Sequence, residues 1–236
     1  MSNTRIRPAT LSSTALQNAV GHRISHEFTH AIAAINQLSG LYDSLIVLHD
    51  TPDPSRTKEA RALRYKQQHE AAIRKAKTLL EQVAGNMDTL ARKARESAEQ
   101  KAGLHEHMSD ALAAELRGAL RSLPEKDRNA AIMSAATHKE VGILKAVIES
   151  PSALLIGPVS VPLDQIITDY LDTADPSYRE TRQDVESAQT HFEFALDTFI
   201  TETKKLRDPA LEEKAEIQQQ AITRAETQLQ EGEAAA

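Results

Sequence analysis

Apolar residues in the first part of the chain recur at alternating intervals of four and three, the spacing of a helix that buries one face. These positions, which we term the first seam, are Ile24, Phe28, Ala31, Ile35, Leu38, Tyr42 and Leu45. The pattern stops at Asp50, Pro52 and Pro54, because proline lacks a backbone N–H and disfavours helix in the residue before it. The sequence therefore predicts one long helix from Ser12 to His49.

A second set of apolar residues follows this proline-containing linker with the same spacing. These positions, the second seam, are Ile73, Ala76, Leu80, Val83, Met87, Leu90 and Ala94. Ser55 can cap a helix that begins after it, and Gly103 marks the next break, which predicts a helix from Ser55 to Ala102. Because the linker is short, the two long helices are expected to form an antiparallel hairpin.

The rest of the chain shows shorter helical patterns separated by proline and glycine. The pairs Asp175-Pro176 and Asp208-Pro209 each place an acid at a helix cap and proline at the first helical position, which predicts two C-terminal helices. The predicted organisation is a flexible arm (1–11), the long hairpin (12–102), a compact helical segment with a proline-rich loop (103–174), C-terminal helices (175–230) and a tail (231–236).

The composition agrees with an all-α fold. Only 3% of the residues are aromatic and there is no Trp, so Leu, Ile, Val and Ala must fill the core, which suits helix-on-helix packing. The 8 glycines leave few positions for β-hairpin turns. A hairpin of two helices exposes apolar stripes unless something covers them. Either the C-terminal helices or another subunit must therefore cover the two seams.

The chain contains no Cys, which excludes disulfides, thiolate metal sites and cysteine catalysis. We find no uninterrupted apolar run that approaches the roughly 18 residues of a membrane-spanning helix. Residues 1–10 also lack the apolar stretch of a secretory signal. We therefore expect no membrane partner, and a cytoplasmic or virion-associated location that is not reached through a signal peptide.

The charge is unevenly distributed. The net charge is −6, yet residues 56–101 hold twelve basic and six acidic side chains, a local charge of +6. A basic stretch can contact phosphates, but nucleic-acid-binding domains usually show a stronger basic footprint. We expect this stretch to be a solvated helix face opposite an acidic helix of the same protein, and we do not expect a nucleic-acid partner.

The segment His26-Glu27-Phe28-Thr29-His30 fits the HExxH pattern. On a helix, His26 and His30 lie one turn apart and can share a Zn²⁺ ion, with Glu27 as the general base on a bound water. This stretch resembles zincin metallopeptidases over about eight residues. Zincins also use a third protein ligand and a sheet before the helix, and the sequence shows neither. The two histidines are expected to face away from the first seam.

The same region also resembles the phosphoacceptor box of histidine-kinase dimerisation domains, through Ser25-His26-Glu27-Phe28, Ile32 and Ala34-Ile35. That family builds a dimeric four-helix bundle from a long helix, a turn and a second long helix. The resemblance implies that His26 is phosphorylated and that Glu27 assists proton transfer. The sequence departs from the family at Thr29-His30-Ala31 and has no glycine-rich ATP-binding segment. The resemblance therefore implies a phosphotransfer protein that works with a separate kinase.

A third resemblance, over about twenty residues, is to helical proteins of tailed bacteriophages, and it implies a virion or assembly protein. It is carried by His138-Lys139-Glu140-Val141, Ala146-Val147-Ile148, Pro151-Ser152-Ala153-Leu154 and Gly157.

The sequence predicts a non-enzymatic structural or assembly protein without a cofactor. It is expected to form homo-oligomers, or to bind other helical subunits, through coiled-coil-like packing of its seams. The alternatives are histidine phosphotransfer through His26 and zinc peptidase activity through His26, Glu27 and His30. The HExxH pattern also arises by chance on helical surfaces.

Overall fold

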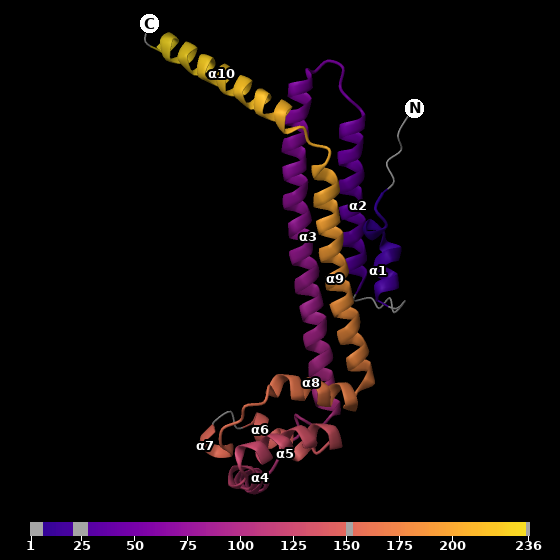
Figure 1. The fold of residues 1–236 in the computed structure, drawn as a ribbon, viewed down its shortest axis with the longest axis vertical. Helices are drawn as coiled ribbons and strands as arrows, with labels where there is room; N and C mark the ends of the chain where they lie inside the picture. The colour runs from indigo at the N-terminus through magenta and orange to yellow at the C-terminus, as the bar shows by residue number, and fades with distance from the viewer. Residues whose placement is uncertain (1–6, 21–27, 150–152, 235–236) are drawn as a thin grey trace. The chain divides into compact units, whose positions relative to one another are not determined.

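The computed structural model describes residues 7–20, 28–149 and 153–234 of the chain. Every regular element in these ranges is a helix, which confirms the all-α class (Figure 1). The elements are η1 (Ala9–Leu11), α1 (Ser13–Ala19), α2 (Thr29–Asp50), α3 (Lys58–Lys101), α4 (Asp110–Ser122), α5 (Glu125–His138), α6 (Val141–Ile148), α7 (Ala153–Ile156), α8 (Leu163–Ala174), α9 (Pro176–Lys204) and α10 (Pro209–Ala234).

The chain divides into two compact units. The first unit consists of residues 1–86 and 187–236, and the second consists of residues 87–186. Both boundaries fall inside long helices, so α3 and α9 each contribute residues to both units.

The N-terminal part of the first unit contains two helices, and the single helix predicted from Ser12 to His49 is wrong. The Ser12 hydroxyl caps α1 by accepting a hydrogen bond at 3.2 Å from a backbone N–H of the first turn. α1 ends at Ala19, and Val20 has left helical geometry with φ −93° and ψ 21°. α1 packs against α2 instead of extending it. Glycine commonly follows a helix end, so Gly21 is the sequence signal that would have predicted this break.

The segment before α1 also packs on the first unit. Residues 9–11, which the sequence places in a flexible arm, form η1, and Leu11 is fully buried. Nε2 of His191 in α9 donates a hydrogen bond to the Thr10 carbonyl at 3.2 Å. This contact ties the N-terminal segment to a helix from the other end of the chain.

The core of the first unit is a bundle of α2, the first part of α3 and the second part of α9, which lie side by side in Figure 1. α2 meets α3 through an edge-on contact of the His49 and Tyr65 rings, whose centroids are 5.8 Å apart. α3 meets α9 through the Tyr65 hydroxyl, which donates to the Thr203 carbonyl at 3.0 Å. A helix of the same chain therefore covers α2 and α3 in this unit.

The structure shows which positions of the two seams are buried. Ile24 lies outside the described residues. Ile73 and Leu80 are only half-buried, whereas their neighbours Ala72 and Leu79 are 7% and 6% exposed. The buried line of α3 therefore runs one residue earlier over this stretch, because α3 faces α9 as well as α2. The buried seam residues are Phe28, Ala31, Ile35, Leu38, Tyr42, Leu45, Ala76, Val83, Met87 and Leu90.

The second unit packs α4 to α8 with the last part of α3 and the first part of α9. α5 ends at His138, and the next residue, Lys139, lies in the left-handed region at φ 59°. The segment predicted as a proline-rich loop contains the short helix α7, whose Ile156 is 4% exposed. The largest fully buried residues of this core are Ile132, Leu144 and Leu171.

A buried arginine holds the loop after α7 in the second unit. Arg128 is 5% exposed. Its guanidinium donates hydrogen bonds to the carbonyls of Leu120 at 2.9 Å, Leu123 at 2.7 Å and Pro158 at 2.6 Å. It therefore adds donors to the carbonyls at the end of α4, where Leu120 also accepts from the backbone N–H of Leu123 at 3.2 Å. Gly157 lies against the guanidinium with φ +83°.

Within the described residues, helix α2 is long and apolar enough to cross a membrane, judged by length and composition alone. An 18-residue window of α2 has a mean hydropathy of 1.4, and 39% of this window is buried inside the protein. Ile35, Leu38 and Tyr42 lie in the bundle core. A core helix of a helical bundle passes the same test, and burial of this face accounts for part of the apolar composition.

Candidate functional site

The chemical site predicted from the sequence falls largely outside the described residues. His26 and Glu27 lie outside them, and His30 is an exposed side chain in the first turn of α2. Within the part of the chain that the structure describes, no three His, Asp or Glu side chains gather closely enough to hold a metal ion. The zinc and phosphotransfer hypotheses for these residues stay predictions.

One buried polar cluster joins α3 to the end of α9. His69 is 1% exposed and stacks on the Tyr65 ring, with centroids 6.0 Å apart. The Thr203 hydroxyl donates to the Phe199 carbonyl at 2.6 Å, so it accepts from Nε2 of His69 at 3.0 Å. Nε2 of His69 therefore carries a proton, and burial lowers the pKa of the ring, which favours its neutral form. Because the ring lies in the core, this cluster holds two helices together and does not face a substrate.

Ion pairs fix the first two turns of α10 on the rest of the first unit. Nε of Arg207 lies 2.9 Å from a carboxylate oxygen of Glu212, which is 4% exposed. Lys66 of α3 pairs with Glu216. The Asp208 carboxylate caps the helix by accepting from the backbone N–H of Leu211 at 3.2 Å. α10 therefore starts at a defined place beside α3.

Beyond this anchor, the side chains of α10 are exposed in the single chain. Every side chain from Ile217 to Gln228 is exposed, including Ile217 at 61% and Ile222 at 52%. With 3.6 residues per turn, Ile217, Ala221, Ile222 and Ala225 fall within an arc of about 140°. Gln218 and Gln228 also fall within this arc, and the opposite side carries Gln, Thr, Arg and Glu. α10 is thus an amphipathic helix whose apolar side faces water in the single chain.

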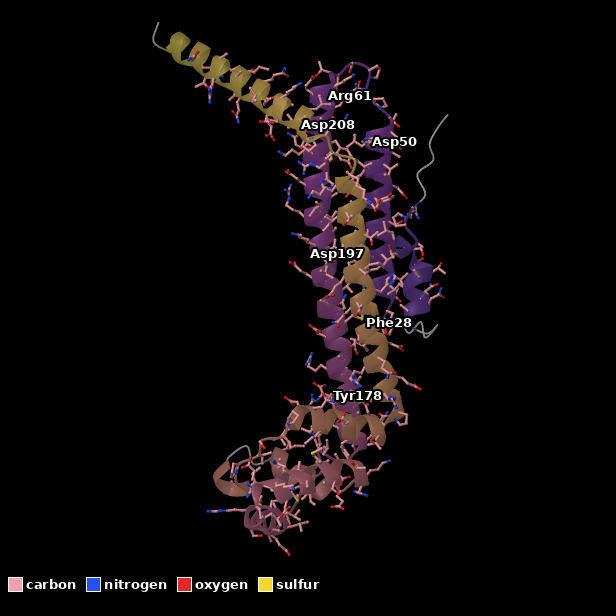
Figure 2. The ribbon with its side chains drawn as sticks, in the orientation of Figure 1. Phe28, Asp50, Arg61, Tyr178, Asp197 and Asp208 are labelled. Atoms are coloured by element: carbon pink, nitrogen blue, oxygen red, sulfur yellow. The ribbon has the colours of Figure 1, made fainter. Side chains whose placement is uncertain are left out.

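A cleft of about 300 Å³ lies beside the start of α10. It is bordered by the α2–α3 linker, the first turns of α3 and the α9–α10 connection, all within the first unit. Figure 2 labels Asp50, Arg61 and Asp208 at this end of the bundle. Its walls combine leucines with basic side chains of α3. Sequence reasoning treated these cations as a solvated face, because the segments that complete the cleft lie about 150 residues apart in the chain.

Comparisons of the chain with protein-family models, with curated proteins and with solved structures give no match.

Proposed function

We propose that this chain is a non-enzymatic structural or assembly protein that forms homo-oligomers through helix-to-helix packing, with α10 as the contact. The supporting observation is the exposure of α10 from Ile217 to Gln228. Isolated helices shorter than about 12–15 residues are marginal in water. An exposed apolar helix face commonly marks an interaction surface. A partner that covers this side supplies the burial that α10 lacks within its own chain.

The partner that fits this surface is α10 of a second copy, and charge supports this choice. α10 carries six acidic and two basic side chains, whereas residues 58–75 of α3 carry six basic and two acidic ones. A groove between these helices is lined by Arg56, Arg64, Leu63, Ala215 and Ile222. It offers cations for the acids of a second α10, and apolar side chains for its apolar side. Because two identical chains present the same groove and the same helix, the contact can be reciprocal.

The assembly that we propose for such an oligomer is a phage particle. This setting rests on the resemblance of residues 138–157 to tailed-phage proteins, and the exposed face of α10 is compatible with repeated copies in one structure.

A pair of aspartate substitutions on neighbouring residues tests the oligomer. Ile222→Asp places a charge on the apolar side of α10, and Thr223→Asp places the same charge on the polar side. Both positions are exposed, so neither change disturbs the packing of the single chain. In sedimentation velocity, the wild-type chain and Thr223→Asp are expected to sediment as a multiple of 25.9 kDa, and Ile222→Asp is expected to shift toward the monomer. A monomeric wild type, or an Ile222→Asp variant that keeps its mass, contradicts the proposal.

The non-enzymatic part of the proposal has a separate test at the histidine motif. His26→Ala, Glu27→Gln and His30→Ala are expected to leave the oligomeric mass and the melting temperature unchanged. Native mass spectrometry of the wild type is expected to show no stoichiometric metal. A zinc ion that is lost on His30→Ala, or a phosphoryl group that is lost on His26→Ala, would overturn the non-enzymatic assignment.

A further inference from the structure

The cleft at the end of the first unit has an apolar wall and a basic rim. Leu48 from α2 and Leu206 and Leu211 from the other end of the chain line one part of it, together with the Tyr65 ring. The Tyr65 ring is fixed, because its hydroxyl bonds to α9 and its face stacks on His69. This part of the cleft is therefore built from side chains that the core already holds in place.

The basic rim comes from the first turns of α3. Lys58 and Arg61 both line the cleft, and neither is joined in an ion pair to another residue of the described structure. By contrast, the nearby cations Lys66 and Arg207 are paired with Glu216 and Glu212. The positive end of the α3 dipole adds to this potential.

The acidic side chains that border the cleft already accept hydrogen bonds from other groups of the protein. The carboxylate of Asp53 accepts hydrogen bonds from the hydroxyl and backbone N–H of Ser55 at 2.6 and 3.0 Å, and from Nε of Arg56 at 3.1 Å. The bonds from Ser55 lower the pKa of Asp53 from its ordinary value. Asp208 caps α10. Neither carboxylate pairs with Lys58 or Arg61 in the described structure, so the rim cations remain free for a ligand.

From this arrangement we infer that the cleft binds a small organic anion with an apolar body, such as an aryl or short alkyl carboxylate. The carboxylate would lie at Lys58 and Arg61, since a guanidinium donates two parallel hydrogen bonds to such a group. The apolar body would lie on Tyr65 and the leucines. A volume of about 300 Å³ is at the lower end of ligand pockets. It accommodates a molecule of this size. This inference does not depend on oligomer formation.

Calorimetric titration with 2-naphthoate tests this site, and α3 itself offers a matched control. Lys58→Gln/Arg61→Gln removes two of the three α3 cations that line the cleft, and Arg64 remains. Arg74→Gln/Lys77→Gln removes the same two residue types at the same spacing from exposed positions of the same helix. The neutral 2-naphthamide tests the need for the anion. Circular dichroism checks that both variants keep their helicity.

The wild type is expected to bind one 2-naphthoate per chain. Lys58→Gln/Arg61→Gln is expected to weaken binding at least about tenfold, because two charge-assisted contacts are lost. The Arg74→Gln/Lys77→Gln variant is expected to bind as the wild type does, and 2-naphthamide is expected to bind at least about tenfold more weakly. The inference is overturned if the wild type does not bind at millimolar ligand, if both double variants weaken binding equally, or if the amide binds as well as the acid.

Discussion

The contact between Gly157 and Arg128 allows one substitution to be worked out in detail. A Cβ atom added at Gly157 would lie 2.5 Å from Cζ of Arg128 and 2.6 and 2.7 Å from its two terminal nitrogens. Arg128 is buried and its guanidinium is held by carbonyls on more than one side. Gly157→Ala must therefore displace the guanidinium, the loop, or both.

Two terms set the expected loss in the free energy of unfolding. The φ of +83° at Gly157 is unfavourable for alanine by about 1 kcal/mol. Displacement of the guanidinium weakens one or two hydrogen bonds from a charged donor, at about 1.5–3 kcal/mol each. We expect a total of about 3–5 kcal/mol, which is much of the stability of a small folded unit. With a urea dependence near 2 kcal/mol per molar, the midpoint falls by about 2 M.

Urea unfolding followed by far-UV circular dichroism measures this loss, and Gly118→Ala is the matched control. Gly118 is an exposed position inside α4 where an added Cβ meets no neighbouring atom. Alanine favours helix, so this second Gly-to-Ala change should raise the free energy of unfolding by about 0.5–1 kcal/mol. The two substitutions in the same unit thus have opposite expected signs.

Measuring Gly157→Ala in a second variant separates the two contributions to the loss in the free energy of unfolding. In an Arg128→Met variant the clash with the guanidinium is gone, so Gly157→Ala should cost only the φ term of about 1 kcal/mol. If Gly157→Ala costs the same in both backgrounds, the contact with Arg128 is not the cause. If it costs less than about 1 kcal/mol in the wild type, the reasoning on the whole loop fails.

Three further predictions concern the core and the titrating groups. His69 is buried and its pKa is lowered, so the unfolded chain binds more protons and stability falls as the pH drops through about 6.5. Between about pH 7.5 and 5.5, the melting temperature of His69→Gln should fall less than that of the wild type. Equal falls would contradict the assignment of His69 as a buried, neutral side chain. Leu79→Asp should lower the melting temperature far more than Leu80→Asp, because Leu79 is 6% exposed and Leu80 is half-buried. The reverse order would restore the seam predicted from the sequence. Hydrogen bonds from Ser177 and Lys101 lower the pKa of Asp175, so its charge stabilises the fold above about pH 4, and this stability is lost as the pH falls through the lowered pKa. Asp175→Asn keeps a capping side chain, so in urea titrations it should be less stable than the wild type at pH 7 and equal to it near about pH 2.

Local signals in the sequence predicted correctly where helices begin at the two Asp-Pro pairs. α9 begins at Pro176 and α10 begins at Pro209, each directly after the capping aspartate that predicted it. These starts depend on a few neighbouring residues, since proline at the first helical position and an acid at the cap act locally. The all-α class followed from the same kind of signal, repeated along the chain.

Local signals could not predict which residues of α3 face the core. Ile73 is larger than its buried neighbour Ala72, and Leu80 is the same size as its buried neighbour Leu79. Side-chain size therefore does not identify the buried member of each pair. That choice depends on the second part of α9, which lies more than 100 residues further along the chain. The break after Ala19 was missed because the apolar spacing of the first seam continues from Ile24 onward and outweighed a single glycine.

The cleft and the exposed face of α10 also depend on distant segments. Arg61 and Leu211 line the same cleft, although 150 positions separate them in the sequence. The thin apolar pattern of α10 gives no sign of whether another part of the chain covers it. Only the packing of the first unit shows that the bundle is complete without the outer part of α10.

Hydrogen–deuterium exchange of the intact wild-type chain tests the central claim most directly, because it reports on the α10 backbone itself. If a second copy covers α10, the amides of residues 217–228 should exchange slowly at high protein concentration and faster on dilution, as the oligomer dissociates. The amides of the buried part of α3 serve as an internal reference that should not change. Exchange of residues 217–228 at the rate of an unstructured peptide, at every concentration, would contradict the account.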